Sequence, residues 1–320
     1  MVWASCRGLG AFTVRVDLPE QTVGWSESVV QGFVARIVHA LEETGDVAVS
    51  SKKRNFADIA LKAWVLVGFV FISFPLFLVA WLSFFTDPLL ALPPSGYSFH
   101  WYSRIFIEPQ FFNGFLLSLE VALIAMVVGL AVSIPAALVL ARSELRGKQF
   151  LMYLLTSPLI VPSIVIGASL YVSFIQLEYL FDWSVIGSTL GLGAAHILIT
   201  IPWCVRLIVA NLLGVDLSVE EASRSLGATP FVTLYKVTIP LIWPGIVAAA
   251  LFSFVISFGN LELSLFLVAP GQITLPIAIL EYLEYKIDPT IAAVSVLQIL
   301  IIGGGLLITN KFVPLARVVK

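Results

Sequence analysis

Six apolar segments, each about as long as a membrane-crossing helix, constrain the fold of this chain more than any other feature. They are residues 59–84, 113–141, 150–176, 186–211, 244–268 and 290–312. A helix needs about 20 apolar residues to cross the hydrocarbon core of a bilayer. Charged residues make up only 12% of the chain, against about 25% in soluble domains. The sequence therefore predicts an all-α polytopic membrane protein with six transmembrane helices in a lipid bilayer.

Several of these segments contain prolines of their own. They are Pro75, Pro135, Pro158, Pro162 and Pro202. A proline inside a membrane helix is tolerated where neighbouring helices satisfy the freed carbonyl groups. The prolines therefore predict a packed bundle rather than separate anchors.

Lysine and arginine concentrate on one side of the predicted membrane. With the N-terminus inside, and residues 1–51 set apart, the inner side holds Lys52, Lys53, Arg54, Lys62, Arg142, Arg146, Lys148, Arg206, Arg224, Lys236, Lys311, Arg317 and Lys320. The outer side holds only Arg104 and Lys286. Positive residues favour the cytoplasmic side, so both termini are predicted to be cytoplasmic. The outer segment 97–112 is rich in aromatic residues, and Trp101 and Tyr102 suit the membrane interface.

Residues 216–240 form a polar loop between two apolar segments, on the predicted cytoplasmic side. Ser218 and Glu221 have the spacing of a capping box, in which two side chains satisfy free amide groups at a helix start. Gly227 suits the left-handed position just after a helix end. The loop is therefore predicted to begin with a short helix and a tight glycine turn.

A second helix is predicted to follow that turn. Thr229 can cap its first turn, and Pro230 fits its first position. Pro240 predicts that this helix ends or bends near residue 239, because the residue before a proline avoids helical geometry. The loop thus reads as a helix-turn-helix.

The same loop resembles the EAA loop of ABC-importer permeases. That pattern is Glu-Ala-Ala, three residues, Gly, nine residues, then Ile-x-Leu-Pro. The matching positions here are Glu221, Ala222, Ser223, Gly227, Val237, Ile239 and Pro240. Ser223 stands in for the third small residue, and Val237 and Ile239 for the apolar pair. The wider resemblance covers residues from about 56 to 312 and is closest to spermidine/putrescine-type permeases.

The resemblance implies a permease subunit of an ATP-driven importer in the bacterial inner membrane, with a five-helix core and a first span that wraps a partner. The partners it implies are ABC ATPase subunits that receive the EAA loop, a second permease subunit and a periplasmic solute-binding protein, with no nucleic acid. The chain itself carries no ATP site, because Gly147-Lys148 lacks the first glycine and the Ser or Thr of a phosphate loop. No enzymatic activity, cofactor or metal is therefore expected in this chain.

Two glutamates interrupt apolar segments, which is costly unless they face a cavity or a partner. Glu120 and Glu262 both fall in the outer halves of their predicted spans. One interpretation is a path for a cationic solute that also includes Asn260. The other is that each glutamate reaches the lipid headgroups or bonds a neighbouring helix. Spermidine-type permeases carry acidic residues where this chain has Gly259 and Asn260.

His196 is the histidine that lies deep inside an apolar segment. A hydrogen bond between helices is favoured over metal binding, because no Cys/His cluster surrounds it in the sequence.

The domain prediction is an N-terminal extension over residues 1–55, weakly ordered, followed by a permease domain over 56–320 with the coupling loop at about 216–240. A polyamine-like cation is the predicted solute. The alternatives are another solute, such as ferric iron, a sulfonate or phosphonate or an amino-acid derivative, or a non-transport role in assembly or signalling.

Overall fold

A computed structural model describes residues 3–5, 13–15, 56–88, 92–182 and 184–312 of the chain. Its contacts divide the chain into two units, Met1–Ser73 and Phe74–Lys320. The first unit contains a two-stranded antiparallel sheet of β1 (Trp3–Ser5) and β2 (Thr13–Arg15), and the start of helix α2 (Phe56–Leu82). The rest of the predicted 1–55 extension lies outside the described residues, so its weak order stays a prediction.

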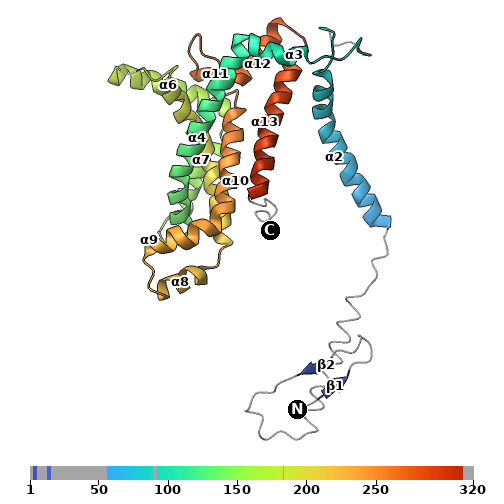
Figure 1. The fold of residues 1–320 in the computed structure, drawn as a ribbon. Coiled ribbons are helices and arrows are strands. Elements are labelled where there is room, and N and C mark those ends of the chain that lie inside the picture. Colours follow the sequence, from blue (N-terminus) through green and yellow to red (C-terminus); the bar gives the residue numbers. More distant parts are fainter. Residues whose placement is uncertain (1–2, 6–12, 16–55, 89–91, 183, 313–320) are drawn as a thin grey trace, which may run out of the picture. The chain divides into compact units, whose positions relative to one another are not determined.

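The second unit contains the end of α2 and a bundle of helices (Figure 1). In chain order these are α3 (His100–Ile107), α4 (Pro109–Arg142), α5 (Lys148–Thr156), η1 (Ser157–Leu159), α6 (Ser163–Phe181), α7 (Thr189–Leu213), α8 (Leu217–Ser225), α9 (Pro230–Thr233), η2 (Leu234–Thr238), α10 (Ile239–Phe258), α11 (Ser264–Leu267), α12 (Leu275–Tyr285) and α13 (Thr290–Phe312). Among the described residues, 6 helices are long and apolar enough to cross a membrane. The predicted fold class is therefore confirmed.

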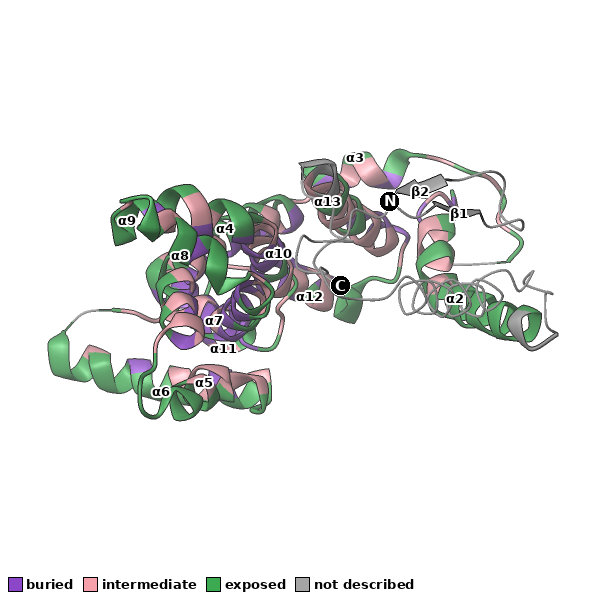
Figure 2. Cartoon of the chain, turned by 90° about the horizontal axis from the view of Figure 1, so that it is seen from below, coloured by how far each residue is buried: buried purple, intermediate pink, exposed green. Residues whose placement is uncertain are grey.

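Helices α4, α7 and α10 pack together as the core of the bundle, and Figure 2 shows that much of α7 and α10 is buried. Small residues allow this close approach. A Cβ added to Gly245 of α10 would lie 2.6 Å from the Asn211 side chain of α7. A Cβ added to Gly129 of α4 would lie 3.1 Å from Thr200 Oγ1 of α7. Glycine at such contacts lets helix backbones approach each other in the membrane.

Two predicted spans have different bounds in the structure. The third was predicted over 150–176, but α5 ends at Thr156 and α6 begins only at Ser163. Pro158 and Pro162 lie in this break. A proline cannot donate the backbone hydrogen bond that continues a helix, so these two residues interrupt it. The fifth was predicted to reach residue 268, but α10 ends at Phe258.

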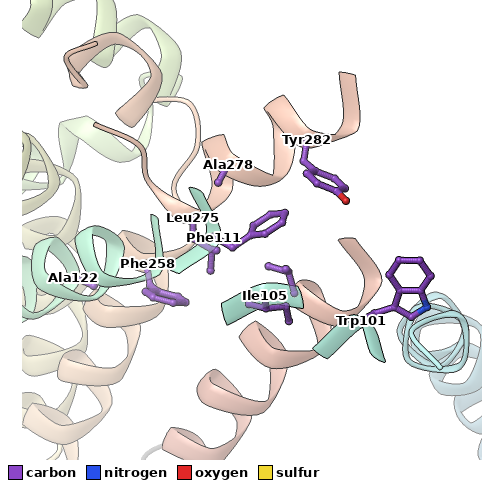
Figure 3. Close-up of a cluster of buried hydrophobic side chains, with 10 residues drawn as sticks. Trp101, Ile105, Phe111, Ala122, Phe258, Leu275, Ala278 and Tyr282 are labelled. Atoms are coloured by element: carbon purple, nitrogen blue, oxygen red, sulfur yellow. The ribbon is translucent and has the colours of Figure 1, made fainter. Parts of the chain in front are cut away.

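The α3–α12 end of the bundle contains a cluster of buried aromatic and aliphatic side chains (Figure 3). The rings of Phe111 and Tyr282 lie 5.1 Å apart. The expectation that Trp101 lies at the membrane interface was wrong. Its side chain is only 5% exposed, and its indole N–H donates to the Phe85 carbonyl at 2.5 Å. An internal acceptor lets the indole be buried within the chain.

Candidate functional site

Helix α8 opens the predicted coupling loop, and its cap differs from the predicted one. Asp216, not Ser218, is the capping residue, and Asp216 Oδ1 accepts the Ser218 backbone N–H at 2.9 Å. The hydrogen bonds from Ser218, first from its backbone and then from its side chain, lower the pKa of the Asp216 carboxyl. The predicted capping box of Ser218 with Glu221 was therefore wrong, because the helix begins at Leu217 and both residues lie inside it.

The turn after α8 has the predicted glycine geometry. Gly227 has a φ of 88°, and its N–H donates to the Arg224 carbonyl at 2.9 Å. Thr229 then caps α9, since its hydroxyl accepts the Val232 N–H at 3.4 Å, and Pro230 is the first residue of that helix. Helix, tight turn and second helix are thus present at the positions that the sequence indicated.

The second helix was predicted to end or bend near residue 239, and the structure shows an irregular turn there rather than an end. One helical stretch runs from Pro230 to Phe258, with the π-helical turn η2 just before the proline. In this turn the Ile239 N–H donates to the Leu234 carbonyl, five residues back. Pro240 lacks an N–H for the usual four-residue bond, and a π-helical turn accommodates this irregularity without ending the helix.

The helix-turn-helix presents a mixed surface. The large apolar side chains exposed on it, which we call the loop surface, are Leu217, Val219, Leu226, Phe231, Val232 and Tyr235. Leu226 and Phe231 are 90% and 75% exposed. Glu221 and Ala222 are exposed beside them, and Ser223 is half-buried with its hydroxyl 3.1 Å from Thr233 Oγ1. Large apolar side chains exposed close together in the sequence are a feature that the proposal below must account for.

The other motif residues lie nearer the bundle. Val237 and Ile239 are half-buried, and Ile239 packs on the buried cluster shared by α4, α7 and α10. Pro240 is exposed. The motif therefore runs from an exposed helix, through the Gly227 turn, to side chains in contact with the core.

A buried ion pair at this site was missed by sequence reasoning. Arg142, the last residue of α4, lies 3.0 Å from Glu220 Oε1 of α8, and the two side chains are 16% and 7% exposed. Arg142 also donates to the Val215 carbonyl at 3.2 Å. Two adjacent glutamates on a helix point about 100° apart, so only one of Glu220 and Glu221 can face the bundle. The sequence does not say which one does.

A cavity of about 220 Å³ adjoins this ion pair. It is lined by Leu138, Arg142, Glu220, Arg224, Pro230, Thr233, Leu234 and Thr238. The wall of the cavity between the end of α4 and the α8–α9 loop therefore carries the ion pair.

The predicted solute-path residues lie toward the other end of the bundle. Glu120 is exposed on α4. Glu262 is exposed too, but in the turn between α10 and α11, not inside a span as predicted. Asn260 shapes that turn, since its side-chain oxygen accepts the Leu263 N–H at 2.9 Å. Neither glutamate forms an ion pair within the described part of the chain.

His196 of α7 fixes the same turn from inside. Its ring nitrogens lie 2.8 Å from Ser257 Oγ and 3.0 Å from Ser264 Oγ, and the residue is 1% exposed. The predicted hydrogen bonding between helices is confirmed. In the described ranges, no group of three or more His, Cys, Asp or Glu residues could hold a metal ion.

Comparison with known proteins now decides the family. Residues 133–312 match the family described as "Binding-protein-dependent transport system inner membrane component". The chain belongs to this family. The permease is thus a subunit of an ABC importer, and the non-transport alternative is dropped.

Among the curated relatives of this permease is the putrescine transport system permease protein PotI of Escherichia coli K12. It is 29% identical over 240 residues, which cover 75% of this chain and 85% of the relative. The spermidine/putrescine transport system permease protein PotC of Haemophilus influenzae is 27% identical over 75% of this chain and 90% of its own length. The molybdenum transport system permease protein ModB of Escherichia coli K12 is 34% identical over 191 residues, or 56% of this chain and 82% of the relative.

Solved structures share the fold of this permease. A bacterial ABC transporter that imports the acidic polysaccharide alginate has a chain with a TM-score of 0.62 and 16% identity, covering 82% of this chain and 98% of that one. The methionine ABC transporter MetNI gives a TM-score of 0.53 and 20% identity, covering 66% of this chain and 98% of that one. At these identities the likeness shows the fold alone.

Proposed function

We propose that this permease moves a small polyamine-like cation from a periplasmic binding protein into the cytoplasm. The observation that carries the proposal is the similarity to relatives named for putrescine and for spermidine/putrescine, over 75% of this chain. Glu120 and Glu262 support it, because both carboxylates are exposed and unpaired in the described ranges and can meet a cation. A charge in a low-dielectric path interacts more strongly with such a carboxylate than it does in water.

We assign the coupling role to the α8–α9 loop. The loop surface offers apolar side chains to a groove on an ABC ATPase subunit, beside the motif residues Glu221, Ala222 and Ser223. Closure of two ATPase subunits on ATP moves the loop, and the Gly227 turn, Val237, Ile239 and Pro240 pass the movement to α10. A second permease subunit completes the path, and the bundle alternates between two packings, one open to each side.

The proposed orientation places the α8–α9 loop and both termini in the cytoplasm. Single cysteines introduced for labelling in intact cells test it, in a variant without the two native cysteines. Positions 97–110 and 281–288 are expected to react with an impermeant maleimide, and positions 142–148 and 217–236 are not. Labelling of a cysteine at Ser225 from outside would overturn the orientation.

The solute is tested by reconstitution of the complete importer with its ATPase and binding protein in vesicles. We expect ATP-dependent uptake of labelled putrescine or spermidine, with no uptake when the binding protein is omitted. Failure to move either polyamine, with uptake of another solute in the same vesicles, would refute the polyamine assignment and leave the permease assignment intact.

An oxyanion is the second candidate solute, because the molybdenum permease relative has the higher identity, 34% against 29%, although over a shorter part of this chain. Molybdate is therefore the comparison solute for the same vesicles. The exposed carboxylates Glu120 and Glu262 repel an oxyanion, which is why the cation is preferred.

A further inference from the structure

We propose that the Arg142–Glu220 ion pair is a positioning link that carries movement of α8 directly into α4. This route is separate from the covalent one that leads through η2 into α10. The inference rests on the proposed function in one respect, since it concerns the ATP-driven movement of the α8–α9 loop.

The geometry of Arg142 shows why it can act as a link. Its Nε donates to Glu220 Oε1 at 3.1 Å and its second terminal nitrogen lies 3.0 Å from the same oxygen. That terminal nitrogen also reaches the Val215 carbonyl at 3.2 Å. One planar guanidinium therefore holds both ends of the short segment from Val215 to Glu220. Arginine suits this role because its donors are rigidly arranged.

Burial makes this contact stiff. The side chains of Arg142 and Glu220 are 16% and 7% exposed, so water competes little for their hydrogen bonds. A buried ion pair adds little net stability compared with apolar packing, because desolvation offsets the attraction. Its contribution here is a fixed distance and direction between the end of α4 and the first turns of α8.

Packing does not supply the same connection. Helix α8 packs mainly on α9 and η2. The cavity of about 220 Å³ lies between α8, α9 and the last turns of α4, and Arg142 and Glu220 are part of its wall. Among the side-chain hydrogen bonds and ion pairs of the described residues, the Arg142–Glu220 pair is the one that joins α4 to α8.

Helix α4 can carry the movement far. It has 34 residues, which corresponds to about 51 Å at 1.5 Å per residue, and its helix continues through the one proline inside it, Pro135. At its other end, Ser118 Oγ accepts the Leu275 N–H of α12 at 2.9 Å. Glu120, a proposed solute-path residue, lies on the same helix. In contrast, the route into α10 begins with the π-helical turn η2, whose hydrogen bonding is irregular.

The test uses the assembled importer in vesicles and measures solute molecules moved per ATP hydrolysed. In Arg142→Ala and in Glu220→Gln, ATPase subunits are expected to stay bound through the loop surface, while this ratio falls on the order of tenfold, within the usual range of coupling between sites. Arg146→Ala is the matched control, since Arg146 is exposed four residues on and forms no ion pair in the described ranges. It is expected to leave the ratio unchanged.

The charge-reversed pair Arg142→Glu with Glu220→Arg separates a positioning role from a structural one. It is expected to restore much of the ratio but not all, because a carboxylate at position 142 cannot donate to the Val215 carbonyl. An unchanged ratio in Glu220→Gln, which keeps the size of the side chain, would overturn the link. Loss of assembly in every pair variant, the reversed one included, would also overturn it, because the pair would then act only in folding.

A distance measurement tests the link without any solute. Spin labels at Ser143 and Ser225 report the separation of the α4 end from the α8 end. With the pair intact, this distance is expected to stay constant between the ATP-free and ATP-trapped importer, and in Arg142→Ala it is expected to change. A change of the distance in the unmodified importer would refute the inference, whereas absence of polyamine uptake alone would refute only the proposed solute.

Discussion

The two ends of the bundle are held together in different ways. At the α3–α12 end, the aromatic cluster of Figure 3 is reinforced by several polar contacts. The Tyr282 hydroxyl donates to Asp288 at 2.7 Å, and Arg104 lies 3.5 Å from the same carboxylate. Lys286 lies 3.9 Å from Glu108. At the α8–α9 end, Arg142 of α4 holds the loop through Glu220 and the Val215 carbonyl, beside a cavity of about 220 Å³.

This difference indicates which end of this permease can move more easily. Overlapping contacts at the α3–α12 end mean that the loss of any one leaves the others in place. At the α8–α9 end, the bonds to Glu220 and to the Val215 carbonyl both come from Arg142, so the loss of that one side chain removes both. We therefore expect matched substitutions at the two ends to have unequal effects, and the following predictions compare such pairs.

The largest effect is expected from charging the loop surface. The double change Leu226→Asp and Phe231→Asp replaces two side chains that are 90% and 75% exposed. Buried apolar anchors at an interface are each worth about 2 kcal/mol or more, so losing both should weaken ATPase binding by on the order of a thousandfold. The matched control is Tyr285→Asp with Ile287→Asp, two exposed residues at the other end. Affinity of purified permease for its ATPase, measured in detergent, is expected to fall only in the first variant.

A smaller effect is expected at Gly227. Its φ of 88° is unfavourable for a residue with a Cβ, while an added Cβ would meet no atom within 4 Å. The cost of Gly227→Val is therefore backbone strain alone, about 1–2 kcal/mol. Gly271 has a φ of 87° and equal space, so Gly271→Val bears the same strain elsewhere. Both should insert normally, and only Gly227→Val should reduce uptake per ATP. Equal losses in both variants would show that strain, not coupling, limits transport.

The regions where sequence reasoning succeeded and failed differ for a physical reason. The length of the apolar segments predicted the number of spans. Local sequence predicted the turn at Gly227 and the cap at Thr229, because the turn and the cap depend only on neighbouring residues. Which of Glu220 and Glu221 faces inward depends on how α8 is rotated against α4, and local sequence does not determine that rotation. The same holds for the π-helical turn before Pro240, because the local preference allows the helix to end or to bend there and does not determine which.

The break between α10 and α11 was missed for a related reason. Asn260 and Glu262 interrupt the apolar run only briefly, and apolar residues resume in 263–268, so the segment reads as one long span. In the structure, Asn260 caps the turn and His196 holds Ser257 and Ser264 on either side of it. Contacts that join residues more than 60 positions apart leave no local pattern in the sequence.

A still smaller effect, on solute uptake, is expected from changing the two solute-path glutamates. Changing both Glu120 and Glu262 to Gln keeps size and hydrogen bonding but removes two negative charges. Uptake of a polyamine should fall several-fold with normal assembly, since the two lost charges together weaken cation binding by about 1 kcal/mol in a partly hydrated path. Glu284→Gln, an exposed acid on α12, is the control. Unchanged uptake at equal protein levels would contradict the cation path.

The smallest effect compares two exposed carboxylates that cap loops. Asp216 and Asp87 both have a pKa below the ordinary value because of hydrogen bonds, from Ser218 and Ser95 respectively. The main bond to Asp216 comes from a backbone N–H, whereas the main bond to Asp87 comes from the Ser95 hydroxyl, at 2.5 Å. Ser95→Ala should therefore raise the pKa of Asp87 more than Ser218→Ala raises that of Asp216, because alanine keeps the backbone donor.

Titration of the labelled carboxyl carbons by NMR in nanodiscs measures both values. The sign follows from linkage: a carboxyl whose folded pKa is lowered stabilises its loop above the unfolded pKa of about 3.9, and this is lost as the pH falls through the folded value. Protection of the Ser218 and Ser95 amides from hydrogen exchange should decline over that acidic range. Equal pKa changes in the two alanine variants would contradict the distinction, and would show that side-chain and backbone donors hold the two ends alike.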